Sequence, residues 1–116
     1  MLFELQMSAQ ELFEKVANHL LKQGKRCVGP DEYCQYRFEG LMCAAGILIP
    51  DEVYNDTFEG KDWQTLIEQC DFPTQHRDLI CSLQSIHDYR KNPEDWRPYL
   101  ISLGKRHNLN TEFLVE

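Results

Sequence analysis

A cysteine and a histidine are the residues of this sequence best suited to covalent chemistry. Cys43 begins an apolar run that ends at Ile49, and we expect this run to form a buried helix. A thiol at the N-terminus of a helix has a lowered pKa, because the helix dipole favours the thiolate. His87 could then act as its base, so one hypothesis is a small cysteine-dependent enzyme, or a binder of nucleotide-like small molecules, centred on Cys43 and His87.

Two features count against this hypothesis. A cysteine in an apolar run is typically a buried, structural thiol. Asp88 follows His87 directly, so on a helix their side chains should diverge by about 100°, and we expect no relay between them.

The spacing of the metal-ligating residues does not predict a metal site. Structural zinc sites bring their ligands in close pairs, such as two cysteines or two histidines a few residues apart. No two cysteines and no two histidines have this spacing; the residues are Cys27, Cys34, Cys43, Cys70 and Cys81, and His19, His76, His87 and His107. We predict neither a metal nor a cofactor.

Two polar segments beside the apolar run are our candidates for a binding surface. The first is the tip of a predicted hairpin, with Tyr36, Arg37 and Glu39 and with Tyr33 alongside; tyrosine and arginine are enriched at interaction hot spots. The alternative is that Tyr36 belongs to the core and that Arg37 pairs with a surface carboxylate. The second is an acidic loop, and its candidate residues are Asp51, Glu52, Tyr54, Asp56 and Glu59. This loop could instead be only solvated, or its carboxylates could bind a divalent cation or act as acid and base.

Charge and composition limit the classes of partner. The chain of 116 residues carries 19 acidic and 12 basic residues, a net charge of -7, and should be repelled by phosphate backbones. Direct nucleic-acid binding is therefore not expected, whereas a basic protein surface would be attracted. The alternative is that the charge serves solubility alone.

The sequence also predicts where the protein works. It begins without a secretory signal, no segment is apolar enough to span a membrane, and its number of cysteines is odd. We therefore expect a cytoplasmic protein with free thiols and no membrane contact.

The elements that must position these residues are mostly helices. Ser8 and Glu11 form a predicted capping box for a helix that ends at Gly24. A hairpin follows within residues 33–43, then the buried helix over residues 43–49. Further helices should begin at Asp62, at Thr74 and near Asp95, where Pro98 would occupy the third helical position. The prediction is one domain, residues 1–116, with an α+β, mostly α fold of about four helices packed with one short β-hairpin.

A string of residues in the central stretch resembles a family of small uncharacterised proteins from phages and prophages. The residues that carry the resemblance are Cys34, Tyr36, Arg37, Gly40, Cys43, Ala44, Gly46, Leu48, Ile49, Pro50, Asp51, Tyr54, Glu59 and Gly60, with residues 83–88 and Trp96 later in the chain. The resemblance implies a genomic setting rather than a mechanism. In that setting a small acidic protein is expected to bind a host or anti-phage defence protein and inhibit it, in the cytoplasm of the host cell. The sequence favours this interpretation over an enzyme and leaves a homodimer open.

Overall fold

Four α-helices and one short hairpin make up the computed structural model, which describes residues 1–115. In chain order the elements are α1 (Ala9–Gln23), β1 (Arg37–Phe38), β2 (Leu41–Met42), α2 (Trp63–Cys70), α3 (Arg77–Tyr89) and α4 (Trp96–Arg106), with single turns of 3-10 helix at Gly46–Leu48, Asp56–Phe58, Pro93–Asp95 and Glu112–Leu114. The predicted α+β, mostly α fold is confirmed.

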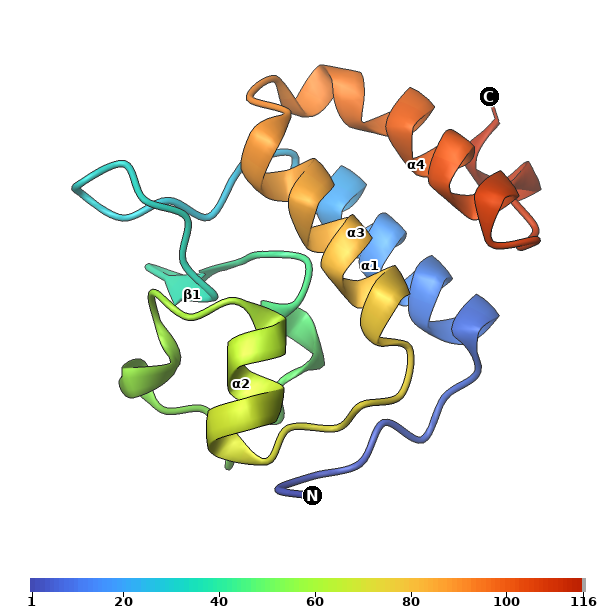
Figure 1. Cartoon of the computed structure of the whole chain (residues 1–116). Coiled ribbons are helices and arrows are strands. Elements are labelled where there is room, and N and C mark those ends of the chain that lie inside the picture. The colour runs from blue at the N-terminus through green and yellow to red at the C-terminus, as the bar shows by residue number, and fades with distance from the viewer. Residues whose placement is uncertain (116) are drawn as a thin grey trace.

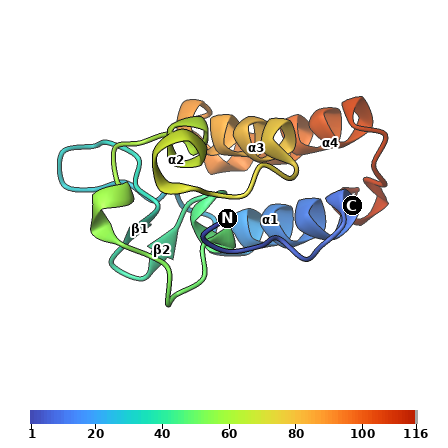
Figure 2. The same ribbon diagram turned by 60° about the horizontal axis from the view of Figure 1, so that its bottom comes forward.

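The helices lie in two layers. Figure 2 shows α2, α3 and α4 in one layer and α1 with the hairpin in the other. α3 is the central element, since it packs against α1, α2 and α4 (Figure 1). The core between the layers holds both tryptophans, Trp63 and Trp96, each almost fully buried.

Local signals determine α1. The Ser8 hydroxyl accepts from the Glu11 N–H, and the Glu11 side chain accepts from the Ser8 N–H, so the predicted capping box is present. Gly24 ends the helix in the left-handed conformation, with φ 63°. Between these caps one face is buried, as its 3.6-residue period predicts, through Leu12, Phe13, Val16, Ala17 and Leu20.

The hairpin is shorter than predicted, although its turn is as expected. The register pairs Arg37 with Met42 and Phe38 with Leu41. Glu39 and Gly40 both have positive φ, as the type I′ turn of a two-residue hairpin requires. Residues 33–36 do not join the strand; Cys34 instead forms an isolated antiparallel bridge with Val28.

The predicted buried helix over residues 43–49 is wrong in its backbone, although the segment is buried. Only Gly46–Leu48 is helical, as one 3-10 turn. A Cβ at Gly46 would lie 2.2 Å from the carbonyl oxygen of Tyr36, so the turn brings the chain against the backbone of the residue that precedes β1. The apolar composition therefore predicted burial correctly and helical length incorrectly.

The starts of the last helices differ in detail. Thr74 does not cap α3; the N-cap is His76, with φ 60°, and Thr74 contributes only its carbonyl, which accepts from the Arg77 N–H. Asp62 caps α2 as predicted, through a bond from the Thr65 N–H. Pro98 lies at the third position of α4, where its missing N–H has no intrahelical partner to lose.

Candidate functional site

The predicted hairpin and acidic-loop residues meet around one carboxylate, that of Glu59. Its Oε1 accepts from the Tyr36 N–H at 2.8 Å. Its Oε2 accepts from the Arg37 N–H at 3.2 Å and from the Tyr54 hydroxyl at 2.6 Å. Burial and the Glu59 carboxylate together raise the pKa of the Tyr54 hydroxyl. We call these four residues the Glu59 cluster; it joins the hairpin to the acidic loop.

Arg37 strengthens this junction. Its guanidinium donates to the carbonyl oxygen of Ile49, forms an ion pair with Asp51 at 2.8 Å and lies 4.6 Å from the centre of the Tyr54 ring. The side chain is 19% exposed. The structure therefore confirms the alternative reading of Arg37, in which it pairs with a surface carboxylate, here that of Asp51.

The candidate binding residues therefore divide into two groups. Tyr36 is 5% exposed, and its hydroxyl donates to the carbonyl oxygen of Lys61, so it belongs to the core rather than to an accessible ribbon. With Arg37, Tyr54 and Glu59 it holds the loops in place. The side chains that remain exposed are acidic: Glu39, Asp51, Glu52 and Asp56.

Cys43 is not placed as a nucleophile. No α-helix begins at this residue, its side chain is fully buried, and its Sγ accepts from the Gly46 N–H at 3.2 Å. Burial raises the pKa of the Cys43 thiol well above its ordinary value, so the thiol stays protonated at neutral pH. This is the opposite of the lowered pKa that the predicted helix N-terminus would give.

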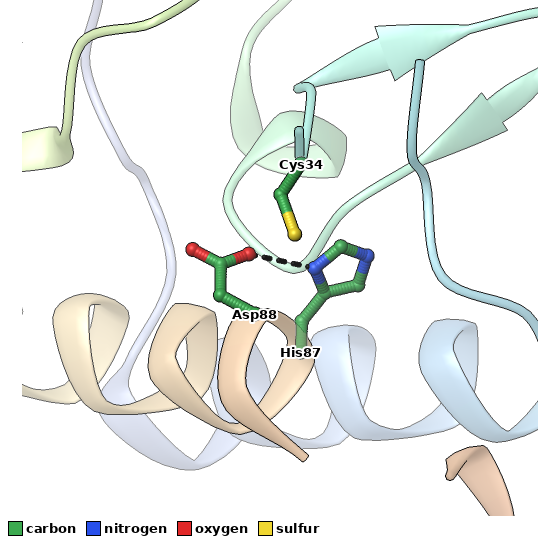
Figure 3. Close-up of side chains that lie close together, drawn as sticks. All are labelled: Cys34, His87 and Asp88. Carbon is green, nitrogen blue, oxygen red and sulfur yellow. Dashed lines mark hydrogen bonds and ion pairs between the residues drawn. The ribbon is translucent and has the colours of Figure 1, made fainter. Parts of the chain in front are cut away.

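His87 lies near the end of α3, fully buried, and both of its ring nitrogens are bonded. Nε2 accepts from the backbone N–H of Cys27 at 2.9 Å, so the neutral ring carries its proton on Nδ1, which donates to Asp88 Oδ1 at 2.8 Å. The expectation that these two adjacent side chains diverge was wrong, because the Asp88 carboxylate turns toward Nδ1 of the ring near the helix end (Figure 3). His87 is thus bonded to Cys27 and Asp88, not to Cys43.

The cysteine that approaches this pair is Cys34, from the loop before β1 (Figure 3). Its Sγ accepts from Arg26 Nη2 at 3.1 Å. Burial raises the pKa of the Cys34 thiol, and the charge and hydrogen bond of the Asp88 carboxylate raise it further, while Arg26 acts in the opposite direction. The protonated thiol is therefore the stable form, and the trio does not form an activated nucleophile.

The trio has the composition of a metal site but not the hydrogen bonding of one. One ligand atom each from Cys34, His87 and Asp88 lie within 4.8 Å of one another. A metal on Nδ1 of His87 would require the proton on Nε2, where it would point at the N–H of Cys27. Arg26 adds a positive charge beside the sulfur. The donor set therefore does not suit a cation.

Beside the trio lies a cleft of about 370 Å³, lined by Tyr33, Cys34, Gln35, Tyr36, Gly60, Lys61, Asp62, Gln84, Asp88 and Tyr89. Tyr33 and Tyr89 are 73% and 77% exposed. The Asp88 side chain is 27% exposed, and its Oδ1 also accepts from Gln84 Nε2 at 2.7 Å, which fixes the carboxylate. We call this hollow the tyrosine cleft.

Sequence reasoning missed the tyrosine cleft. The sequence places Tyr33 beside the predicted hairpin and Cys34 among the cysteines and in the resembling string, and it carries no signal for Tyr89. The cleft forms between the loop at residues 33–36, residues 60–62 and the end of α3, and no local pattern brings these three segments together.

No model of a known protein family matches the chain, and searches of curated proteins and of solved structures give no match either. The resemblance to small proteins of phages and prophages therefore stays a prediction. Within residues 1–115, none of the helices combines the length and the apolar character needed to cross a membrane.

Proposed function

We propose that this protein is a non-enzymatic accessory module that acts by binding a second protein, and that the bound surface of that partner is basic. In the setting that the resemblance implies, the partner is a host or anti-phage defence protein, and binding inhibits it in the cytoplasm of the host cell. The observation that carries the proposal is the tyrosine cleft, where exposed aromatic rings stand beside a fixed carboxylate.

The chemistry of the cleft suits an arginine or lysine side chain. Tyr33 and Tyr89 offer ring faces that attract a cation, and Asp88 offers a carboxylate that is already oriented by Gln84 and His87. Two of the lining residues are acidic, Asp62 and Asp88, and one is basic, Lys61, whose ammonium group donates to the carbonyl oxygen of Thr57. This balance favours a cationic guest.

The surroundings of the cleft add to this preference. The loops at residues 28–35 and 50–62 lie at the same end of the molecule (Figures 1 and 2). The second of them carries the exposed Asp51, Glu52 and Asp56. With a net charge of -7 on the whole chain, this end would steer a basic surface toward the cleft.

The alternative, a cysteine-dependent enzyme or small-molecule binder centred on Cys43 and His87, has less support. Cys43 is fully buried with a raised thiol pKa, and His87 uses both nitrogens for other bonds. A general base needs a nitrogen within reach of the nucleophile.

The test is a pull-down from bacterial lysate with matched variants. Tyr33→Ala removes one wall of the cleft, and Glu52→Lys/Asp56→Lys reverses the charge beside it. Glu112→Lys is the control, because it makes the same kind of change at an exposed residue four positions before the C-terminus, and the C-terminus lies at the other end of the molecule from these loops (Figure 1). We expect wild type and Glu112→Lys to recover the same partner, and the two cleft-end variants to recover roughly tenfold less, as loss of a hot spot implies.

Equal recovery by all four proteins would refute the proposed docking end, and recovery of no partner would refute the proposed function. If light scattering shows a mass that rises with concentration and Tyr33→Ala abolishes the rise, the cleft binds a second copy of the chain instead. Arg37→Glu is unsuitable for this test, because Arg37 holds the loops together.

A further inference from the structure

A second hollow, between α3 and α4, has the opposite charge. It is open to solvent, has a volume of about 300 Å³ and is lined by Ser82, Ser85, Ile86, Tyr89, Arg90, Tyr99, Ser102 and Arg106. Among residues 1–115, two arginines and no acidic residue line it, in a chain where acidic residues outnumber basic ones. We call it the arginine groove.

The helical period explains how the groove forms. Ser82, Ser85 and Tyr89 recur three and four residues apart on α3, and Tyr99, Ser102 and Arg106 do the same on α4. Each set is therefore a stripe along one helix, and the two helices pack side by side. Ile86, which is 8% exposed, closes the floor between the stripes.

The polar groups of the groove have unused hydrogen-bonding capacity. Within residues 1–115, the side chains of Ser82, Ser102 and Arg106 make no hydrogen bond or ion pair. The Arg90 side chain also makes no hydrogen bond or ion pair within residues 1–115. Its guanidinium lies 3.9 Å from the centre of the Tyr99 ring, across the gap between the helices. A guanidinium and two hydroxyls near one end, with a cation stacked on a ring near the other, suit a ligand with an anionic group and a planar group.

We propose that the arginine groove binds a nucleoside monophosphate. The phosphate is placed between Arg106, Ser82 and Ser102, because one guanidinium and two hydroxyls line this end of the groove and because a guanidinium matches phosphate geometry. The base is placed against the Arg90–Tyr99 stack and beside the exposed ring of Tyr89. Ser82 and Tyr89 are seven residues apart on α3, which separates the two ends of the groove by about 10 Å along the helix.

This inference does not rest on the proposed function. The tyrosine cleft and the arginine groove share only Tyr89 among their lining residues, and their charges are opposite. The test therefore leaves Tyr89 unchanged, so that failure of one proposal does not decide the other.

The experiment is a calorimetric titration of the wild-type protein with AMP, with adenosine and inorganic phosphate as separate arms. We expect saturable binding of AMP, with adenosine and inorganic phosphate each at least tenfold weaker, because each lacks one of the two recognised groups. Arg106→Gln should weaken AMP binding roughly tenfold or more, which is the effect of losing one charge-assisted hydrogen bond. Lys105→Gln removes the adjacent exposed cation, which does not line the groove, and should leave the affinity within twofold.

Absence of saturable AMP binding would overturn the proposal, as would equal weakening by Arg106→Gln and Lys105→Gln, which would indicate only non-specific attraction. Inorganic phosphate binding as tightly as AMP would overturn the nucleoside part. Amide chemical shifts supply a second readout: AMP should move the signals of Ser82, Tyr99 and Ser102, and a response confined to other residues would place the ligand elsewhere. Both variants change exposed side chains without a hydrogen bond or ion pair within residues 1–115, so we expect both to fold.

Discussion

Replacing Glu59 by glutamine tests whether one carboxylate holds the hairpin and the acidic loop together. Its two oxygens accept from the N–H groups of Tyr36 and Arg37, and Oε2 also accepts from the Tyr54 hydroxyl. A glutamine side chain has one oxygen and one NH₂ group. Whichever way the amide turns, one of the two backbone N–H groups faces another donor.

The expected loss follows from the number of bonds. A hydrogen bond to a charged group contributes about 1.5–3 kcal/mol, and an unsatisfied buried N–H costs about 1–3 kcal/mol. Glu59 is half-buried, so water can reach part of the cluster and reduce the penalty. We therefore expect Glu59→Gln to lower the free energy of unfolding by about 2 kcal/mol, a large share of the 5–15 kcal/mol typical of a domain.

The measurement is urea unfolding at neutral pH, followed by the fluorescence of Trp63 and Trp96, which are 1% and 0% exposed in the native state. Glu52→Gln is the matched control, since Glu52 is exposed and its side chain makes no hydrogen bond within residues 1–115. Its free energy of unfolding should stay within about 0.5 kcal/mol of wild type. If Glu59→Gln is no less stable than Glu52→Gln, the Glu59 cluster does not hold the loops and the reasoning fails.

Three further predictions concern the turn after β2, the cap of α2 and the buried thiol. Gly46→Ala should destabilise the protein by about 3 kcal/mol in the same urea assay, because its Cβ would lie 2.2 Å from the Tyr36 carbonyl oxygen; a loss below about 1 kcal/mol would contradict this. Asp62→Ala should cost about 1 kcal/mol at neutral pH. The hydrogen bonds from Thr65 lower the pKa of Asp62 in the native state, so the stabilisation by this carboxylate is complete above its ordinary pKa of 3.8 and is lost as pH falls through the lower native pKa. The free energies of unfolding of wild type and Asp62→Ala, measured in urea from neutral to acid pH, should therefore converge. A difference that stays constant with pH would refute the assignment. Cys43 should resist iodoacetamide in the native protein at neutral pH and react after unfolding, as peptide mass mapping would report; rapid native labelling would restore the enzyme hypothesis.

Features that depend on one helical turn could be predicted from the sequence. The capping box of Ser8 and Glu11, the end of α1 at Gly24 and the cap at Asp62 each involve residues no more than three or four positions apart. Their geometry is set by the backbone that they terminate, so residue type and spacing suffice.

The backbone of residues 43–49 could not be predicted in this way. Its composition indicates burial, and burial is what the structure has. The path is decided by a non-local contact, because the chain must bring Gly46 against the Tyr36 carbonyl and the Ala45 N–H against the side-chain oxygen of Gln84 at 2.8 Å. The composition of residues 43–49 does not indicate that Tyr36 and Gln84 are their contacts.

The candidate sites depend even more on distant contacts. A hydrogen bond joins Cys27 to His87, 60 positions later in the chain. Cys34, which comes from the loop before β1, approaches Asp88 at the end of α3. The rule that adjacent helical side chains diverge failed at His87 and Asp88 because it describes where side chains leave the helix, not where their ends lie. The short side chain of an aspartate can turn its carboxylate toward the ring of the preceding residue near the end of a helix.

Arg26 explains why the tyrosine cleft is formed before any partner binds. Its guanidinium donates to the carbonyl oxygens of His87 at 3.2 Å and Asp88 at 2.7 Å, in the last turn of α3, where carbonyls lack intrahelical partners. The helix dipole favours a cation at this end. The same side chain donates to Cys34 Sγ, so it joins the loop that carries Tyr33 to the helix that carries Tyr89. Because both walls are already held, a partner would not have to order them on binding, and Arg26 acts as a positioning residue without lining the cleft itself.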